Sequence, residues 1–255
     1  MALTDKVPMP AGINSGVTNA KQATMLAVLG NPRSSYDQTC QPLTNPALRT
    51  MVVVQSVGPF RVQGLLPAVQ SLKAVMDDVA AKQPAVHAVL GTAGMLCARL
   101  VRGSTTSISN HSWGTAVDLT VDGVLEPQGD RLVQDGLARI FPIFNAHGWY
   151  WGAGFPVPDG MHFECGDELI RKFHAGGAFG PAGGVPAAGL LSLGDRGAEV
   201  ASLQRKLNDE DNAQLDVDGD FGRDTQAAVM AFQAAHGLRV DGVAGAETLG
   251  ALGLT

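Results

Sequence analysis

The segment SNHSWGTAVD places an imidazole and a carboxylate seven positions apart around a glycine, as His111, Gly114 and Asp118. From residue 116 to 121 apolar side chains alternate with Ala, Asp and Thr, which is typical of a half-buried strand and turns Asp118 away from the core. Gly114 allows a turn tight enough to bring His111 and Asp118 together. These two side chains could bind a metal ion, but two ligands are too few to define a site.

A second segment, PDGMHFE, supplies further groups of the same kind. Period-two alternation places His162 and Glu164 on one face of a strand, with Asp159 just before it. Catalytic zinc commonly has three protein ligands and one position for water, and His111, Asp118 and His162 carry suitable donor atoms. A carboxylate outside this ligand set could take a proton from water. The two segments together predict a catalytic zinc site.

The elements that must position these residues are of mixed type. Apolar residues recur at helical spacing from Leu65 to Ala80, and a second helical stretch runs from about Asp130 to Ala146. Pro142 should kink or end the second helix. Short apolar runs at 51–54 and 86–90 indicate strands. We therefore expect an α+β fold, with a small antiparallel sheet flanked by helices.

Composition divides the chain into three parts. Residues 175–189 contain small residues, two prolines and no charged residue, so this stretch cannot bury a core of its own. We predict a Gly/Ala/Pro linker there. It would join a catalytic domain at 1–174 to a smaller domain at 190–255.

The smaller domain contains an internal repeat. The pattern LxVDGxxGxxT occupies residues 215–225 and recurs 23 positions later, at 238–248. Its glycines suit tight turns, and an acidic residue with Thr suits the start of a helix. The acidic run DVDGDFG lacks the Gly at position six and the Glu at position twelve of an EF-hand, so we expect no calcium there. The pattern predicts three short helices.

These repeats resemble the peptidoglycan-binding domain type 1, whose helical repeats carry LxVDGxxGxxT followed by AVxxFQxxxGL. The match extends from about Leu191 to Leu254 and covers the whole predicted domain. The resemblance implies attachment to the bacterial cell wall, with peptidoglycan as the partner and no chemistry in this domain.

The two metal-binding segments resemble the M15 family of zinc peptidases. That family includes D-alanyl-D-alanine carboxypeptidases, D-Ala-D-Ala dipeptidases and phage L-alanyl-D-glutamate endopeptidases, and it carries SxHxxGxAxD followed by an acidic residue three before a second histidine. The first motif is filled here by Ser109, His111, Gly114, Ala116 and Asp118. The resemblance implies that His111, Asp118 and His162 bind zinc and that Asp159 is the general base. Many members have Glu at the base position, so the shorter Asp159 must lie closer to the reacting water.

The family also has an arginine upstream of SxHxxG that contacts substrate or the developing oxyanion. Arg99 and Arg102 both qualify, and related RxxRG sequences favour Arg99. Either guanidinium could stabilise a tetrahedral intermediate or bind a substrate carboxylate. The choice between them stays open.

Other residues near the two segments are expected to support the site. Glu164 follows the second histidine, and a hydrogen bond to a metal ligand is a better-fitting role for it than that of the base. The aromatic residues are either core side chains or one wall of the substrate groove. The residues expected to contact ligands or substrate are Ser109, Glu164, Arg102, Trp113 and Trp149.

Bulk properties exclude several other functions. The net charge of −6 and the pI near 5.4 argue against nucleic acid, because phosphate binding needs a basic surface. No stretch approaches the roughly 20 apolar residues of a membrane span, so we expect no membrane insertion. The first ten residues lack a basic segment followed by an apolar run, which predicts a chain made in the cytoplasm without a signal peptide.

Three cysteines, Cys40, Cys97 and Cys165, form no CxxC pair, which argues against a thiolate metal site. Buried free thiols are the simplest interpretation. A Cys97–Cys165 bridge is left open.

These features together predict a monomeric, two-domain zinc peptidase that cleaves the stem peptide of peptidoglycan. A chain without a leader but with a wall-binding domain suits a phage endolysin that is made in the host cytoplasm and acts on the wall after release. This favours L-alanyl-D-glutamate endopeptidase activity. The alternatives are a D-alanyl-D-alanine carboxypeptidase and a zinc-containing protein that binds the wall without cutting it.

Overall fold

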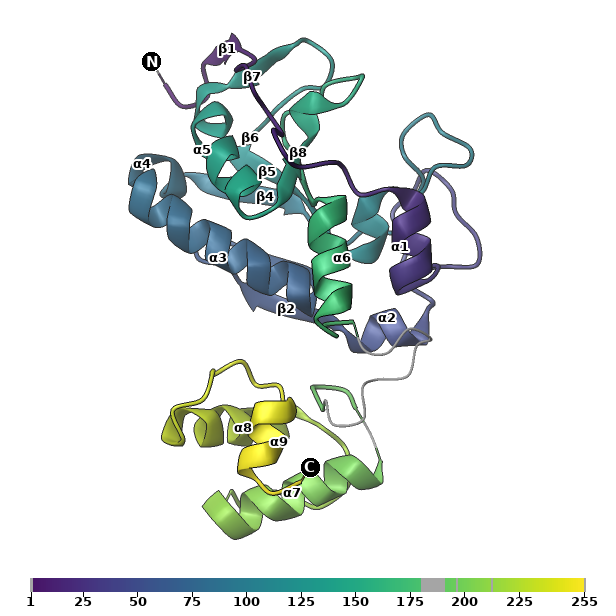
Figure 1. The fold of residues 1–255 in the computed structure, drawn as a ribbon, viewed down its shortest axis with the longest axis vertical. Helices are drawn as coiled ribbons and strands as arrows, with labels where there is room; N and C mark the ends of the chain where they lie inside the picture. The colour runs from purple at the N-terminus through teal and green to yellow at the C-terminus, as the bar shows by residue number, and fades with distance from the viewer. Residues whose placement is uncertain (1, 180–190, 196, 212, 255) are drawn as a thin grey trace. The chain divides into compact units, whose positions relative to one another are not determined.

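A computed structural model describes the chain except residues 1, 180–190, 196, 212 and 255 (Figure 1). Contacts group the chain into two compact units, Met1–Ala182 and Gly183–Thr255, and each unit has its own hydrophobic core. Of the linker predicted at 175–189, residues 180–189 lie outside the described residues. Before them, Phe179 is buried and packs edge-on against Phe173, at 5.8 Å between ring centroids. The predicted domain limits stay predictions.

The first unit is built around an antiparallel sheet. Its strands lie in the order β4 (Leu90–Gly94), β5 (Ala116–Val121), β9 (His162–Cys165) and β8 (Trp149–Trp151), and β6 (Val124–Leu125) also pairs with β5. Alternation along these strands gives the sheet one apolar face and one polar face. With the surrounding helices, this confirms the predicted α+β fold.

Helices cover the apolar face of the sheet. On α5 (Asp135–Ala146), Phe144 packs against Phe163 of β9 at 4.1 Å between ring centroids. On α3 (Leu66–Lys82), Ser71 accepts a hydrogen bond from the Trp149 indole at 3.0 Å. The predicted helix at 65–80 is therefore present, as α3.

The strand predicted at 86–90 is wrong, and of the two effects expected of Pro142 an end to the helix is not found. Residues 86–90 do not form a strand, because Pro84 opens the short helix α4 (Pro84–His87), and β4 starts only at Leu90. Proline suits the first turn of a helix, where its missing N–H leaves no bond unmade. Pro142 does not end α5, which continues to Ala146, and its side chain is exposed to solvent.

The second predicted helix also begins later than residue 130. Residues 132–134 form strand β7 (Leu132–Gln134), which pairs with β1 (Lys6–Pro8), and α5 starts only at Asp135. The chain therefore enters α5 directly from β7, and the polar turn at 127–131 comes before β7.

The N-terminal residues pack along the first unit. In Figure 1 this segment, drawn in purple, runs from β1 past β8 to α1 (Gln22–Leu29), which lies beside α6 (Asp167–Ala175). Asn14 anchors it by accepting a hydrogen bond from the Trp151 backbone N–H at 2.8 Å. The segment thus forms part of the domain surface, with bonds along its length.

A short hairpin and a short helix complete this unit. Helix α2 (Pro46–Thr50) starts with the Asn45 side chain capping two backbone N–H groups, and the hairpin β2 (Val52–Ser56)–β3 (Arg61–Leu65) follows it. Residues 52–54 of the strand predicted at 51–54 thus belong to β2, while Met51 caps α2.

The cysteines agree only in part with the simplest interpretation of the sequence, because only Cys165 is a buried free thiol. Cys40 and Cys97 form a disulfide with their Cα atoms 5.0 Å apart, while Cys165 is free and buried. Gln41 and Ala98 form a β-bridge next to the disulfide, which brings the two segments together. Because Cys97 is bonded to Cys40, the Cys97–Cys165 bridge does not form, and Cys165 lies on β9.

The second unit contains the helices α7 (Ala198–Asp211), α8 (Arg223–Ala235) and α9 (Ala246–Ala251) among its described residues. Leu203, Phe221 and Phe232 lie in its core. The three-helix prediction is therefore confirmed.

Buried glutamines explain the internal repeat. The Gln204 amide donates to Asp218 Oδ1 at 2.8 Å and to Thr225 Oγ1 at 3.2 Å, and its oxygen accepts from the Gly219 N–H at 2.9 Å. The second repeat makes the same bonds through Gln233, Asp241, Thr248 and Gly242. Each glutamine ties a VDG turn to the start of the next helix, so the motif is held by a polar group that is itself buried.

No helix in the described part of the chain combines the length and apolar character needed to cross a membrane.

Candidate metal centre and active site

The sheet and one turn bring the predicted metal ligands together. Strands β5 and β9 pair so that Asp118 lies directly opposite His162, on the polar face. His111 lies in the short 3-10 helix Asn110–Trp113, which ends at Gly114 in the left-handed region, with φ of 64°. The chain then enters β5 two residues later, so His111 returns over the strand that carries Asp118.

The three candidate ligand atoms form a nearly equilateral triangle. His111 Nε2, Asp118 Oδ1 and His162 Nδ1 are each 3.2 Å from the other two. Ligand atoms that bind a tetrahedral zinc ion at 2.0–2.1 Å are about 3.3–3.4 Å apart. The triangle therefore has the size of one face of a zinc coordination tetrahedron.

In each histidine, one ring nitrogen lies outside the triangle, and its hydrogen bond determines the protonation of the nitrogen that lies inside it. His111 Nδ1 lies 2.8 Å from the Met95 carbonyl oxygen and His162 Nε2 lies 2.9 Å from Glu164 Oε2, so these two nitrogens carry protons. In neutral rings the other two nitrogens direct lone pairs toward Asp118. Three acceptors at this spacing repel one another unless a cation lies among them, so the donor set fits a metal ion.

The pKa values of the ligands agree with this arrangement. Burial alone lowers the pKa of His162, but hydrogen bonds with Asp118 and Glu164 outweigh it and raise the pKa to about 10. Burial likewise opposes ionisation of Asp118, and the bonds with His111 and His162 hold its pKa below the ordinary value. Without a metal, a proton on His162 takes the place of the cation.

Gly114 is required by both its backbone conformation and its surroundings. A Cβ added at this residue would lie 2.9 Å from the Gly64 Cα and 3.0 Å from the Leu65 nitrogen. Leu65 also donates its N–H to the Gly114 carbonyl at 3.1 Å. The turn that aims His111 is therefore packed directly against the backbone of β3.

Gly114→Ala is expected to lower the free energy of unfolding by about 2–5 kcal/mol, from left-handed strain and steric overlap together. Gly123→Ala is the matched control, because Gly123 has a φ of 72° but nothing within 4 Å of an added Cβ. Gly123→Ala should lower the free energy of unfolding only by the cost of the left-handed conformation, about 1–2 kcal/mol. Urea unfolding of both variants checks this, and equal losses would show that the contact with Gly64 contributes nothing.

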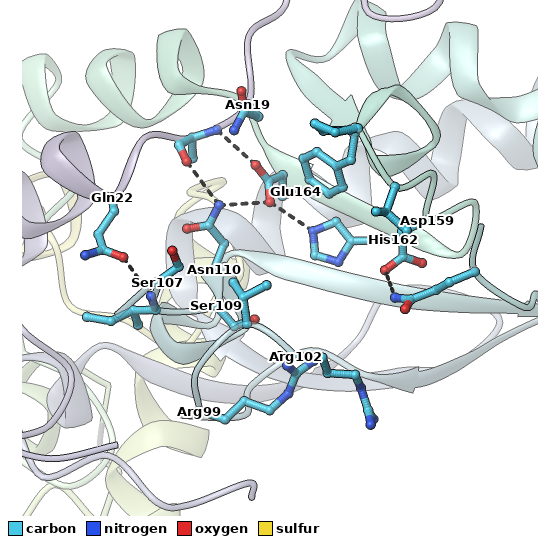
Figure 2. Close-up of a pocket in the computed structure, with 17 residues that line it drawn as sticks. Asn19, Gln22, Arg99, Arg102, Ser107, Ser109, Asn110, Asp159, His162 and Glu164 are labelled. Atoms are coloured by element: carbon cyan, nitrogen blue, oxygen red, sulfur yellow. Dashed lines mark hydrogen bonds and ion pairs between the residues drawn. The ribbon is translucent and has the colours of Figure 1, made fainter. Parts of the chain in front are cut away.

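Glu164 holds the His162 ring from behind. Its Oε2 accepts hydrogen bonds from His162 Nε2 at 2.9 Å and from Asn110 Nδ2 at 2.8 Å, and its Oε1 accepts from the Ala20 N–H at 2.9 Å. Figure 2 shows Glu164 between Asn110 and His162. The carboxylate is almost fully buried. Its bonds are those of a group that orients a ligand.

Asp159 lies at the mouth of β9, three residues before His162. Its backbone is held by a bond from its N–H to the Gly152 carbonyl at 3.0 Å. Burial raises the pKa of its carboxyl, and the nearby Asp118 acts in the same direction. A carboxylate that is more basic than usual suits proton transfer.

A pocket of about 550 Å³ opens beside these groups (Figure 2). Asp159, His162 and Glu164 line one part of it, and Arg99 and Arg102 line another. The structure thus places the candidate base, a candidate zinc ligand and both candidate arginines around one cavity.

The two arginines differ in how firmly they are held. The Arg99 backbone is fixed on both sides by the Ser112 hydroxyl, at 3.0 Å each, and its guanidinium is half-buried and donates to the Leu100 carbonyl at 3.0 Å. Burial lowers the pKa of Arg99, while Asp118 and Asp159 raise it. Arg102 is exposed at the same pocket. A preference for Arg99 stays a prediction, supported by its fixed position.

Two aromatic residues do not contact the pocket. Trp113 and Trp149 are fully buried, and their indoles donate to the Gly30 carbonyl at 2.8 Å and to the Ser71 hydroxyl at 3.0 Å. Trp149 lies on the apolar face of the sheet, whereas His162 lies on the polar face. The expectation that these side chains contact substrate is therefore corrected: both belong to the core. Ser109, by contrast, lines the pocket.

Sequence reasoning missed several contributors. Asn110 stands next to a predicted ligand, so its role could have been suspected from the motif. Ser112, which fixes Arg99, lies in the same motif. Asn19 and Gln22 line the pocket from the N-terminal segment, and Gln128 bonds to Asp159 from a loop. No pattern marked these last three.

Comparison with known proteins identifies both parts of the chain. Residues 102–165 match a family of M15 peptidases described as D-alanyl-D-alanine carboxypeptidase, and residues 196–252 match the putative peptidoglycan binding domain. The chain therefore carries an M15 D-alanyl-D-alanine carboxypeptidase-type domain followed by a C-terminal peptidoglycan-binding domain. The family match and the His–Asp–His donor group identify zinc as the cofactor.

Two curated relatives share a short region with the chain. A zinc D-Ala-D-Ala carboxypeptidase of Streptomyces albus G is 46% identical over 63 residues, which is 24% of this chain and 25% of that protein. The N-acetylmuramoyl-L-alanine amidase CwlM of Mycobacterium tuberculosis is 45% identical over 56 residues, 22% of this chain and 14% of that protein. The chain thus spans a quarter or less of each relative's length.

Solved structures also match over short regions. The Burkholderia AP3 phage endolysin is 52% identical, with 26% of this chain and 25% of that chain covered and a TM-score of 0.25. A fused Zn-dependent amidase/peptidase/peptidoglycan-binding protein of Clostridium acetobutylicum is 37% identical, with 25% and 28% covered and a TM-score of 0.23.

Proposed function

We propose that this chain is a zinc-dependent peptidase that hydrolyses an amide bond in the stem peptide of peptidoglycan. The observation that carries the proposal is the triangle of His111, Asp118 and His162, together with the carboxylate of Asp159, which lines the same pocket as His162. Three ligands leave a coordination position free, which is the arrangement of catalytic rather than structural zinc.

The residues of the chain have separate roles in this reaction. His111, Asp118 and His162 would hold the zinc ion, which when bound supplies positive charge that acidifies water and polarises a carbonyl. Asp159 takes a proton from the attacking water and returns it to the leaving amine. A fixed guanidinium such as that of Arg99 stabilises the negative charge that develops on the carbonyl oxygen.

We further propose that the bond cleaved lies between L-alanine and D-glutamate, as in an endopeptidase. A pocket of about 550 Å³ is larger than a terminal D-Ala-D-Ala requires, so it leaves room for peptide that continues past the scissile bond. The two arginines at this pocket suit an acidic peptide. D-alanyl-D-alanine carboxypeptidase activity is the second candidate, supported by the description of the matched family.

The C-terminal unit is proposed to bind peptidoglycan and to keep the peptidase close to an insoluble substrate. Such tethering raises the effective concentration of enzyme at the wall without changing the chemistry. The site of action is then the cell wall, on the periplasmic or extracellular side, and the protein works as a monomer.

The deciding experiment is digestion of isolated peptidoglycan by the purified protein, followed by mass spectrometry of the released and residual peptides. New amino termini on D-glutamate are expected. Release of free D-alanine would instead establish the carboxypeptidase. Binding to the wall without any new terminus would support the non-catalytic alternative and contradict the peptidase proposal.

A further inference from the structure

The loop between β6 and β7 contacts the segment that carries Asp159 at successive positions. The Gln128 side-chain amide donates a hydrogen bond to Asp159 Oδ2, and the Gly129 N–H donates to the Pro158 carbonyl at 2.9 Å. Side chain and backbone of the loop thus bond to two adjacent residues. The loop and the candidate base form one local unit.

The same loop is anchored at its start. Glu126 is buried, its Oε2 accepts from the Gln134 N–H at 2.6 Å, and its Oε1 pairs with Lys6 Nζ at 3.1 Å. Glu126 also packs against Gly160, where an added Cβ would lie 2.6 Å from Glu126 Oε1. Gln128 therefore lies in a loop that is anchored at Glu126, and Glu126 packs against the segment that contains Asp159.

The two carboxylate oxygens of Asp159 have different surroundings. Oδ2 accepts the bond from Gln128, whereas Oδ1 is buried and has no hydrogen-bond partner among the described residues. A buried carboxylate oxygen without a donor is costly and calls for an explanation. Asp159 lines the same pocket as His162, so the unbonded oxygen lies in a residue that borders the reaction site.

We propose that Gln128 is a positioning residue for the hydrolytic reaction. Its amide holds Oδ2 of Asp159, which leaves Oδ1 as the oxygen that accepts the proton from the attacking water. This inference rests on the proposed function. It goes further in assigning the proton to one oxygen and in naming the residue that selects it.

A glutamine is chemically suited to this task. An amide donor is neutral, so it orients a carboxylate without forming the ion pair that Lys or Arg would form. The short side chain of Asp also leaves little freedom to approach the water by rotation. One hydrogen bond on Oδ2 is then enough to fix the direction of Oδ1.

The test compares Gln128→Ala and Gln128→Glu with the unmodified full chain, using isolated peptidoglycan as substrate. Both variants should lower kcat by about tenfold to a hundredfold, the effect of losing one hydrogen bond to a charged group. KM and bound zinc should stay unchanged. Gln128→Glu matters most, because it keeps the size of the side chain but its carboxylate cannot donate. Gln63→Ala, at an exposed glutamine on β3 away from the pocket, is the matched control.

Each outcome decides a different question. Unchanged kcat in Gln128→Glu overturns the inference while leaving the proposed function intact. A raised KM with unchanged kcat also overturns it, because Gln128 would then bind substrate and not position the base. If the unmodified protein cuts no peptide, the proposed function fails first and the role of Gln128 fails with it. Gln128 is exposed, so both variants should fold, and a circular dichroism spectrum checks this.

Discussion

Asp159→Asn is expected to lower kcat for peptide release from peptidoglycan by about 10²–10⁴-fold, the usual contribution of a general base. Asn has nearly the same shape as Asp but does not take up a proton, so the pocket keeps its form while proton transfer is lost. Asp159 is not among the three donors of the metal triangle. Zinc content, measured by atomic absorption on the purified variant, should therefore equal that of the unmodified protein.

Glu164 is the competing carboxylate, and the structure distinguishes the two. Both oxygens of Glu164 already accept hydrogen bonds, from His162, Asn110 and Ala20, which commits this carboxylate to holding the His162 ring. Oδ1 of Asp159 has no such bond within the described structure. If Asp159→Asn had the same kcat as the unmodified protein, another group would have to take the proton.

The control for this prediction is Asp122→Asn, at an exposed aspartate in the turn between β5 and β6. It makes the same chemical change in the same unit, away from the residues that line the pocket. Its kcat should be unchanged. A comparable loss in this variant would mean that the effect of Asp159→Asn is not specific to the base position.

Much of the candidate metal site could be predicted from sequence, because two local rules orient its side chains. Glycine allows the turn before β5, and period-two alternation places Asp118 on one face of its strand and His162 on one face of its own. Which strands pair, and in what register, is a tertiary property. The pairing of Asp118 with His162 across β5 and β9 therefore became visible only in the structure.

Other parts of the fold depended on contacts that no local pattern encodes. Cys40 pairs with Cys97 because a β-bridge between neighbouring residues joins segments 57 positions apart. Gln128 lies in a loop without periodicity, and its contact with Asp159 requires the loop to be anchored at Glu126. Sequence alone leaves Trp149 between the groove and the core, and the pairing of β8 with β9 places it in the core.

His111→Ala is expected to abolish stoichiometric zinc binding and, with it, peptide release. The variant keeps only two of the three donor atoms that meet at 3.2 Å, and catalytic zinc sites in proteins commonly use three. Zinc bound after dialysis should fall from about one ion per chain to near zero. His147→Ala is the control, because His147 bonds to Asp78 and is not part of the triangle.

The same site predicts how zinc changes thermal stability. A ligand at a hundred times its Kd stabilises the folded state by about 2.7 kcal/mol, which raises Tm by about 5–10 °C in a unit of this size. The two units have separate cores, so calorimetry should show two transitions, and zinc should shift only the one from Met1–Ala182. Chelation should reverse the shift, and His111→Ala should not show it. Because the inward-facing atoms are all acceptors, an unmodified protein whose Tm ignores zinc would mean that a proton on His162, and not a metal ion, holds this triangle together.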